Sequence, residues 1–169
     1  MADRQFGIET LCLHAGQIPD AATGARALPI YQTTSFVFDS AEHASSLFNL
    51  QTFGNVYSRI SNPTVSAFEE RVATLEGGTG AVATASGQAA QYIAITTLLG
   101  PGDQIVASNA LYGGTYTQFK DILPDLGIEV RFVDSNNPEN FAAAADEKTR
   151  AFFCESVSNP ALEISSLAA

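Results

Sequence analysis

The segment ASGQAAQYIAITTLLGPGDQIVAS, residues 85–108, holds one complete passage from helix to strand and decides the fold class. Ser86 is a helix-capping residue type, and an apolar stretch follows it through Leu98. The Gly-Pro-Gly run at residues 100–102 breaks the helix, because proline lacks a backbone donor and glycine favours turns. Gln104–Ser108 then reads as a strand. The segment predicts a helix, a sharp break and a strand in that order.

The same alternation extends on both sides of this segment. Upstream, Asn62-Pro63 is a typical helix start and Gly77-Gly78 a typical stop, with one apolar face between them. The other predicted elements are strands over Ala81–Ala85, Ile128–Val133 and Ala151–Glu155, a helix over Thr115–Leu123, and an alanine-rich helix from Asn137-Pro138 through Glu147. Strands that alternate with helices at this spacing imply right-handed crossovers. The sequence therefore predicts an α/β fold with a mainly parallel sheet.

The first 61 residues differ from the rest because they lack a sustained hydrophobic period. They contain Pro19, Pro29 and several glycines, with apolar clusters such as residues 36–38 between them. A long irregular segment that is also apolar is expected to pack against another surface. We therefore predict an irregular N-terminal arm over residues 1–61 that packs on a neighbouring subunit, and an α/β domain over residues 62–169.

Composition narrows the function classes. The chain has 169 residues, 46% of them hydrophobic, and only 15% are charged, against roughly 25% in an average soluble domain. This shortfall suggests that part of the surface is covered by another subunit or by further chain. The formal net charge of −10 disfavours binding of nucleic acid or an anionic membrane through a general field. Any bound anion must be held by backbone dipoles and a few placed cations.

The sequence also bears on compartment and metal binding. It has no apolar run of the ~20 residues that span a bilayer, and its first ten residues do not resemble a signal peptide. Cys12 and Cys154 lie far apart and form no metal-binding pattern with His14 and His43. We expect no metal site, two surface or satisfied histidines, a small core residue at Cys154, and a cytoplasmic, reduced protein.

Ligands of parallel α/β sheets bind beyond the carboxyl ends of the strands. At one such end, Gly87 and Gln88 open a predicted helix, so their backbone N–H groups lack intrahelical acceptors and favour an anion. The alternative is a serine-capped helix without a ligand. A nucleophile elbow is excluded because Thr84 and Gln88 replace its two glycines. A dinucleotide fingerprint is excluded because the glycines at residues 78 and 80 precede the strand.

Three further residues or pairs are candidates for binding. Arg59 can grip a phosphate through two parallel N–H bonds and Tyr57 can add a hydroxyl donor, although a surface ion pair of Arg59 is the plainer explanation. Tyr112 falls at a predicted strand end before two glycines and can stack on a planar ligand or simply pack on its loop. Asn159 precedes a proline, which holds it extended and turns its amide toward the same edge, unless the segment is only a turn.

These segments, taken together and in this order, resemble the Cys/Met-metabolism family of pyridoxal-phosphate (PLP) enzymes over essentially the whole chain. The motif at residues 57–64 is highly specific for the family, whereas the Ser-Gly turn alone is not. Residues 13–16, 23–36 and 47–51 are most similar to the O-acetylhomoserine sulfhydrylase branch. Gln88 stands where several other branches carry methionine, which is consistent with that branch.

The resemblance implies the fold of type I PLP-dependent transferases, here a truncated large domain, and PLP as cofactor. It implies that Gly87 and Gln88 bind the cofactor phosphate through backbone N–H groups. It also implies that Tyr57 and Arg59 bind the phosphate of the neighbouring subunit's cofactor in a homodimer or homotetramer with shared sites. The resemblance further assigns ring stacking and possible proton transfer to Tyr112, a hydrogen bond to the phenolic oxygen of the cofactor to Asn159, and a supporting role to Glu155.

The implied reaction is PLP-dependent γ-replacement on O-acetyl-L-homoserine, in which the acetyl group leaves Cγ and sulfide or a thiol adds there. The products are homocysteine or methionine, as in methionine biosynthesis. A cystathionine γ-synthase or a methionine γ-lyase of the same family is the alternative. A nucleotide-binding protein is disfavoured, because the sequence has no phosphate-binding lysine loop.

One feature of the family is missing from the sequence. The family requires a lysine for the Schiff base and an aspartate on the pyridine nitrogen, both downstream of the Asn-Pro motif. The lysines of this chain, Lys120 and Lys148, do not match that position. We therefore expect an amino-terminal fragment that is inactive by itself and binds the cofactor weakly. The alternative is a catalytically inactive assembly module.

Overall fold

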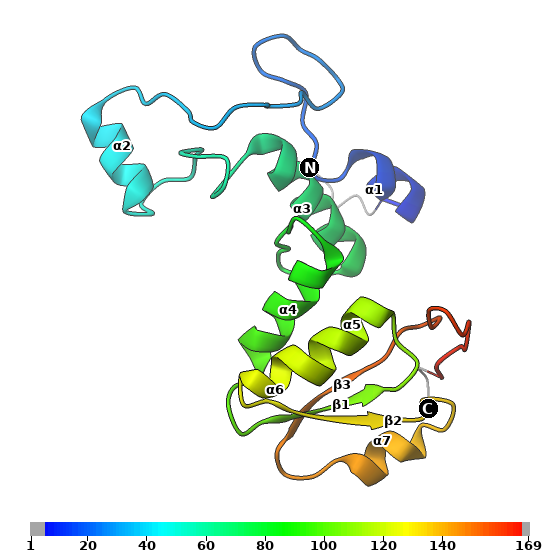
Figure 1. Cartoon of the computed structure of the whole chain (residues 1–169). Helices are drawn as coiled ribbons and strands as arrows, with labels where there is room; N and C mark the ends of the chain where they lie inside the picture. The colour runs from blue at the N-terminus through cyan, green and yellow to red at the C-terminus, as the bar shows by residue number, and fades with distance from the viewer. Residues whose placement is uncertain (1–5, 167–169) are drawn as a thin grey trace. The chain divides into compact units, whose positions relative to one another are not determined.

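The computed structural model describes residues 6–166 and divides into two compact units, Met1–Ala83 and Thr84–Ala169 (Figure 1). The longest helix among residues 6–166 has 14 residues, and none of the helices is both long and apolar enough to cross a bilayer.

Between residues 6 and 83, the first unit contains three helices joined by irregular segments. They are α1 (Ile8–His14), α2 (Ala41–Phe48) and α3 (Pro63–Glu76). The side chain of Asn62 accepts a hydrogen bond from the Thr64 N–H and so caps α3, and Gly77 ends the helix in the left-handed conformation with φ of 66°. These caps confirm the helix predicted from Asn62-Pro63 to Gly77.

Helix α3 packs on α1 and on the turn that follows α1. Ala67 and Ala73 are its buried positions, and a Cβ at Gly16 would lie 2.4 Å from the carbonyl oxygen of Ala67. The apolar face that the sequence predicts for this helix lies elsewhere on its surface. Val65 and Phe68 remain 41% and 59% exposed, so the first unit does not bury that face.

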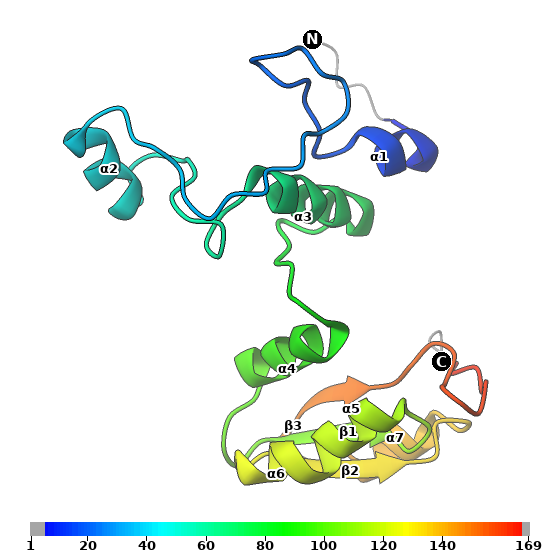
Figure 2. The ribbon, with the colours of Figure 1, turned by 45° about the horizontal axis from the view of Figure 1, so that its top comes forward.

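The second unit is built on a parallel sheet of three strands. The strand order is β2-β1-β3, with β1 at Gln104–Ser108, β2 at Glu129–Val133 and β3 at Thr149–Phe153. Both pairings are parallel, and the three arrowheads point to the same edge (Figure 2). The parallel sheet predicted from the sequence is therefore confirmed.

Helices cover both faces of this sheet. Its helices are α4 (Gly87–Leu98), α5 (Gly113–Thr117), α6 (Leu123–Asp125) and α7 (Glu139–Ala144), with a π-helical turn, η1 (Gln118–Ile122), between α5 and α6. The continuous α5–α6 helix and α7 lie on opposite sides of the strands (Figure 1). Every residue of β1 is buried, because this strand has a neighbour on each side and a helix layer on each face.

The main core lies between the sheet and the helices that begin at α4 and α5. Its buried members are Ile95, Leu99, Ile105, Ala107, Leu111, Phe119, Leu123 and Ile128. Phe119 also contacts Phe153 of β3 edge-to-face, with ring centroids 4.8 Å apart. Burial of these side chains holds the helix that follows β1 against the sheet.

One predicted strand is absent from the described part of the structure, and several other predicted elements have different bounds. Ala81–Ala85 forms no strand, because no strand among residues 6–166 pairs with it and an unpaired strand has no ladder of hydrogen bonds. The helix expected over Thr115–Leu123 starts earlier, at Gly113, and contains the π turn. The last strand lies at Thr149–Phe153 and ends before Glu155, whose carboxylate bonds other loops.

Helix α7 also ends three residues earlier than expected, at Ala144 instead of Glu147. The Nη1 of Arg131 donates to the carbonyl oxygen of Ala144 at 2.9 Å, and its Nη2 lies 2.9 Å from Asp146. Acidic side chains are unfavourable at a helix C-terminus. Arg131 therefore binds the last carbonyl group of α7 and also the Asp146 carboxylate, which would be unfavourable inside the end of the helix.

The ion pair between Arg131 and Asp146 predicts a specific acid sensitivity of the second unit. The Lys148 backbone N–H and the Arg131 guanidinium hold the pKa of Asp146 below its ordinary value. A lowered pKa stabilises the fold above the pKa of the unfolded chain, and this stabilisation is lost as the pH falls through the folded value. We expect Asp146→Asn to lower the urea midpoint at neutral pH and to flatten its decline below about pH 4.

The matched control is Asp125→Asn, which removes the same charge at the exposed end of α6. Its urea midpoint should follow the wild-type curve against pH. Equal pH profiles for Asp146→Asn and the wild type would contradict this assignment.

Candidate functional site

Three segments of the second unit meet at the carboxyl edge of its sheet. They are the start of α4, the loop between β1 and α5, and the segment after β3, and Figure 2 shows all three on the side to which the arrowheads point. The sequence places candidate residues in each segment: Gly87 and Gln88 in the first, Tyr112 in the second, Glu155 and Asn159 in the third.

The first turn of α4 leaves backbone donors exposed. The Ser86 Oγ accepts the Ala89 N–H at 3.1 Å, and the Ser86 carbonyl accepts the Ala90 N–H at 3.0 Å. In the described part of the chain, no hydrogen bond uses the N–H of Gly87 or Gln88. A Cβ at Gly87 would meet no atom within 4 Å. The turn therefore presents two free donors beside open space, in a helix dipole that favours an anion.

Tyr112 lies next to this turn. In the sequence it directly precedes α5. A Cβ at Gly114 would lie 2.7 Å from Cε1 of Tyr112 and 3.3 Å from Nε2 of Gln88. The ring therefore lies over the backbone of Gly114, which only glycine permits at this spacing. Half of the Tyr112 surface remains exposed, and no described hydrogen bond uses its hydroxyl. The ring is thus free to contact a ligand.

Glu155 joins the loop after β1 to the segment after β3. Its Oε1 accepts the Tyr112 N–H at 2.8 Å, and its Oε2 accepts the Asn159 N–H at 3.1 Å. A carboxylate is suited to this task because both of its oxygens are acceptors. The side-chain amide of Asn159 takes part in none of the described hydrogen bonds and the residue is exposed. Glu155 therefore has a defined structural role, which is to hold two candidate ligand contacts in place.

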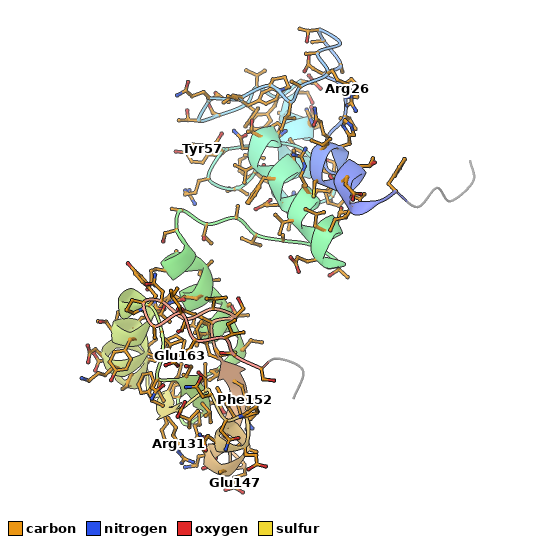
Figure 3. The ribbon with its side chains drawn as sticks, turned by 90° about the vertical axis from the view of Figure 1, so that its right-hand side faces the viewer. Arg26, Tyr57, Arg131, Glu147, Phe152 and Glu163 are labelled. Carbon is orange, nitrogen blue, oxygen red and sulfur yellow. The ribbon has the colours of Figure 1, made fainter. Side chains whose placement is uncertain are left out.

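Tyr57 and Arg59 lie in the first unit, in the loop before α3, where Tyr57 is labelled in Figure 3. Tyr57 forms an antiparallel bridge with Ser35, and the Arg59 guanidinium carbon lies 5.3 Å from the centre of the Tyr57 ring. None of the ion pairs formed by residues 6–166 includes Arg59. The plainer expectation of a surface ion pair is therefore not realised, and the two side chains lie together in this loop.

Asn62 fixes this loop to the segment before it. Its Nδ2 donates to the Tyr31 carbonyl and to the Ser58 Oγ, both at 2.9 Å, while its Oδ1 caps α3. The residue is buried. One amide side chain thus sets the position of residues 57–59 relative to the helix that follows them.

The two lysines of the chain lie away from the carboxyl edge of the sheet. Lys120 is in the π turn, with its Nζ 5.8 Å from the centre of the Tyr116 ring. Lys148 directly precedes β3, where its carbonyl accepts the Gln104 N–H at 2.9 Å, and so belongs to the amino edge. Neither lysine is placed to attach a cofactor at the candidate site.

The two histidines lie as expected from the sequence, whereas Cys154 does not. His14 is exposed and its Nδ1 lies 3.0 Å from the Arg26 Nη2, and His43 pairs with Asp39 at 3.3 Å. Cys154 is only half-buried, although the sequence suggested a core position. It directly follows β3 and lines an open pocket together with Phe141 and Ala142 of α7, and this explains its partial exposure.

Sequence reasoning missed three residues that contact the candidate site from behind, Gln91, Thr115 and Gln118. They connect to the side chain and the carbonyl of Gln88 by hydrogen bonds. A signal was present in the spacing, because Gln88 and Gln91, and likewise Thr115 and Gln118, are three residues apart. Such pairs share one face of a helix.

Comparison with known proteins identifies the family of this chain. The family model of the Cys/Met metabolism PLP-dependent enzymes matches residues 9–169. Because this match covers nearly the whole chain, the chain belongs to that family, a class of enzymes that depend on PLP. The family resemblance and the type I fold inferred from the sequence are thereby confirmed.

The most informative relatives are O-acetyl-L-homoserine sulfhydrylases. The chain is 59% identical to O-acetyl-L-homoserine sulfhydrylase 1 of Thermus thermophilus over 162 residues, which are 95% of this chain and 38% of the relative. It is 52% identical to O-acetyl-L-homoserine sulfhydrylase of Leptospira meyeri over 166 residues, 98% of this chain and 38% of the relative. The chain thus spans little more than a third of the length of these relatives.

A solved structure from Campylobacter jejuni, assigned as an O-acetylhomoserine (thiol)-lyase, superposes with a TM-score of 0.86 at 40% identity. The match covers 96% of this chain and 40% of that protein, which contains N'-pyridoxyl-lysine-5'-monophosphate. The described units therefore have the fold of a protein that carries this cofactor on a lysine.

The two hydrogen bonds of Glu155 predict that Glu155→Gln, a nearly isosteric substitution, destabilises the two loops locally. In Glu155→Gln one acceptor oxygen becomes an NH₂ group, which faces a backbone N–H and cannot bond it. Losing one charge-assisted hydrogen bond should destabilise the two loops by about 1–3 kcal/mol. In the complete polypeptide that carries these residues, the Tyr112 and Asn159 amides should exchange with deuterium faster, while the amides of β1 remain protected.

Glu163→Gln serves as the control, because that side chain accepts from Asn136 and contacts neither loop amide. Unchanged exchange at Tyr112 and Asn159 in Glu155→Gln would show that the carboxylate does not hold the loops.

Proposed function

We propose that the complete polypeptide carrying these residues is a PLP-dependent transferase that replaces the acetyl group of O-acetyl-L-homoserine with sulfide or a thiol, giving homocysteine or methionine. The observation that carries this proposal is the identity of 52% and 59% to two O-acetyl-L-homoserine sulfhydrylases across nearly the whole chain. Because the chain covers 38% of those proteins, activity, substrate and assembly are proposals for the complete polypeptide.

The described residues fit the phosphate group of this cofactor. A phosphate ester needs several donors and room for three oxygens, and the start of α4 offers the N–H groups of Gly87 and Gln88 beside open space. An anion at this position also gains from the helix dipole. We assign Gly87 and Gln88 as backbone donors to the phosphate.

The described residues also fit the pyridine ring. Tyr112 offers a half-exposed aromatic face held at its backbone by Glu155, and offset stacking of two aromatic rings is favourable. Asn159 offers an unbonded amide, which can donate to the phenolic oxygen of the ring. The lysine that carries the cofactor in such enzymes is not provided by Lys120 or Lys148, and we place it outside this chain.

The second unit lacks a cation to balance the phosphate at this edge. Its described basic residues are Lys120, Arg131, Lys148 and Arg150. Arg131 pairs with Glu129 and Asp146, and Arg150 pairs with Asp103, at the opposite edge of the sheet. We therefore propose that Arg59, with Tyr57, supplies the missing charge from a neighbouring subunit, so that a homodimer or homotetramer shares its sites. The free cysteines fit a cytoplasmic, reduced protein.

Bound PLP supplies an electron sink that stabilises negative charge next to the substrate amino group. The residues of this chain bind and orient it: the start of α4 holds its anionic end and Tyr112 holds the plane of its ring. The Tyr112 Oη has no described hydrogen bond and is therefore available to accept or donate a proton at this edge. Glu155 keeps that ring in position through the Tyr112 backbone N–H.

The reaction is tested by supplying the complete polypeptide with O-acetyl-L-homoserine and sulfide. We expect homocysteine and acetate in equal amounts, and methionine when methanethiol replaces sulfide. The 169-residue chain alone should form neither. Release of 2-oxobutyrate without a thiol product would indicate a γ-lyase, and cystathionine formed only with cysteine would indicate a γ-synthase; either result would contradict the proposed reaction.

Shared sites are tested by mixing two inactive variants of the complete polypeptide. Arg59→Ala removes the donated cation, and Gly87→Asp places a negative charge in the phosphate position, where a Cβ meets nothing within 4 Å. A mixed dimer then has one site with both defects and one with neither, so an equal mixture should regain about a quarter of wild-type activity. If each subunit built its own site, mixing would restore nothing.

The matched control is Gly80→Asp, because a Cβ at Gly80 also meets no atom within 4 Å. This variant should remain fully active alone, which shows that an added carboxylate does not by itself disturb the chain.

A further inference from the structure

A closed circuit of hydrogen bonds lies behind the start of α4. The Gln88 Nε2 donates to the Thr115 Oγ1 at 3.2 Å, and the Thr115 hydroxyl donates to the Gln91 Oε1 at 3.2 Å. The Gln91 Nε2 donates to the Gln118 Oε1 at 2.7 Å, and the Gln118 Nε2 donates to the backbone carbonyl of Gln88 at 3.4 Å. The circuit therefore begins and ends on the same residue.

Each residue in this circuit accepts a hydrogen bond from the preceding residue and donates one to the next. Thr115 has a single hydroxyl proton and gives it to Gln91, so it can accept from Gln88 at the same time. Each glutamine uses one amide oxygen or the backbone carbonyl as acceptor and one N–H as donor. Removal of any one group leaves a partly or fully buried donor or acceptor unpaired.

Two of the four side chains in the circuit are buried. Thr115 is 3% exposed and Gln118 is 8% exposed, and neither polar side chain is left unpaired. Gln88 and Gln91 are partly buried, so water has little access to the Thr115 and Gln118 end of the circuit. Gln118 is also the first residue of the π turn η1, and such turns inside helices often lie at functional sites.

The circuit joins the two elements that carry the candidate ligand contacts. Gln88 and Gln91 belong to α4, while Thr115 and Gln118 belong to the helix that starts directly after Tyr112. One N–H of the Gln88 side chain donates within the circuit, and in the described structure the backbone N–H of Gln88 stays free at the helix start. The same residue thus connects the exposed donors to the buried network.

We propose that Thr115, Gln91 and Gln118 are positioning residues for the phosphate-binding turn, which act through Gln88 by fixing the start of α4 against α5. None of the three touches the ligand. This inference rests on the proposed binding of PLP and identifies what holds its phosphate contacts in place. A ligand that lacks the phosphate should not depend on the circuit.

The test compares Thr115→Val with Thr115→Ser in the complete polypeptide. Valine keeps the volume and the branched Cβ of threonine but removes the hydroxyl, whereas serine keeps the hydroxyl. We expect Thr115→Val to weaken PLP binding by about tenfold, to leave binding of pyridoxal, which has no phosphate, unchanged, and to shift the ³¹P NMR signal of bound PLP. Thr115→Ser should bind both compounds as the wild type does.

The outcomes separate this inference from the proposed function. If the wild type binds no PLP, the proposed function fails. If the wild type binds PLP and Thr115→Val binds it equally well, the positioning role fails. Equal loss of PLP and pyridoxal binding would show a merely structural role and would also overturn it.

A second variant covers the case in which Thr115→Val does not fold. Gln91→Glu keeps the acceptor for the Thr115 hydroxyl and removes the donor to Gln118. It should reproduce the selective loss of PLP over pyridoxal, and wild-type PLP binding by a folded Gln91→Glu would overturn the proposal.

Discussion

The double burial of β1 is the constraint on which the second unit depends. All five residues of this strand are buried, between β2 and β3 in the sheet and between a helix layer on each face. Both neighbours must run parallel to it, because each is reached by a crossover that contains a helix. A parallel ladder brings the ends of all its strands to one edge. Tyr112 and Asn159, 47 positions apart in the sequence, therefore meet on the two sides of Glu155.

At that edge, a few polar contacts determine the orientation of the loops, which hydrophobic packing alone does not determine. Hydrophobic burial fixes the helices on the sheet but does not orient loops, since it has no direction. The Glu155 carboxylate orients the loops after β1 and β3, and the circuit through Thr115 orients the start of α4. Both act on backbone groups close to the candidate ligand contacts. The edge is thus a rigid frame around one open space.

The sequence predicted elements well where the signal was local and poorly where it depended on distant partners. The caps at Asn62 and Ser86 and the strand Gln104–Ser108 were predicted correctly, because capping side chains and turn residues act within a few positions. Ala81–Ala85 was predicted as a strand from its apolar composition, but a strand also needs a pairing partner, which composition does not reveal. The Glu155 bridge and the Gln118 contact link residues 43 and 30 positions apart, and only the fold brings them together.

The strengths of long-range and short-range electrostatic interactions explain how an acidic chain can bind a phosphate. The net charge of −10 acts over distances at which salt already screens it, since the Debye length is about 8 Å at physiological ionic strength. Donors in direct contact with the anion act at about 3 Å in a partly desolvated site, where each interaction is several times stronger than in water. Two backbone N–H groups therefore outweigh the distant field, but they carry only partial charge. A dianion still requires a full cation, and because the described cations of the second unit lie elsewhere, the position of Arg59 decides whether the site is complete within one subunit.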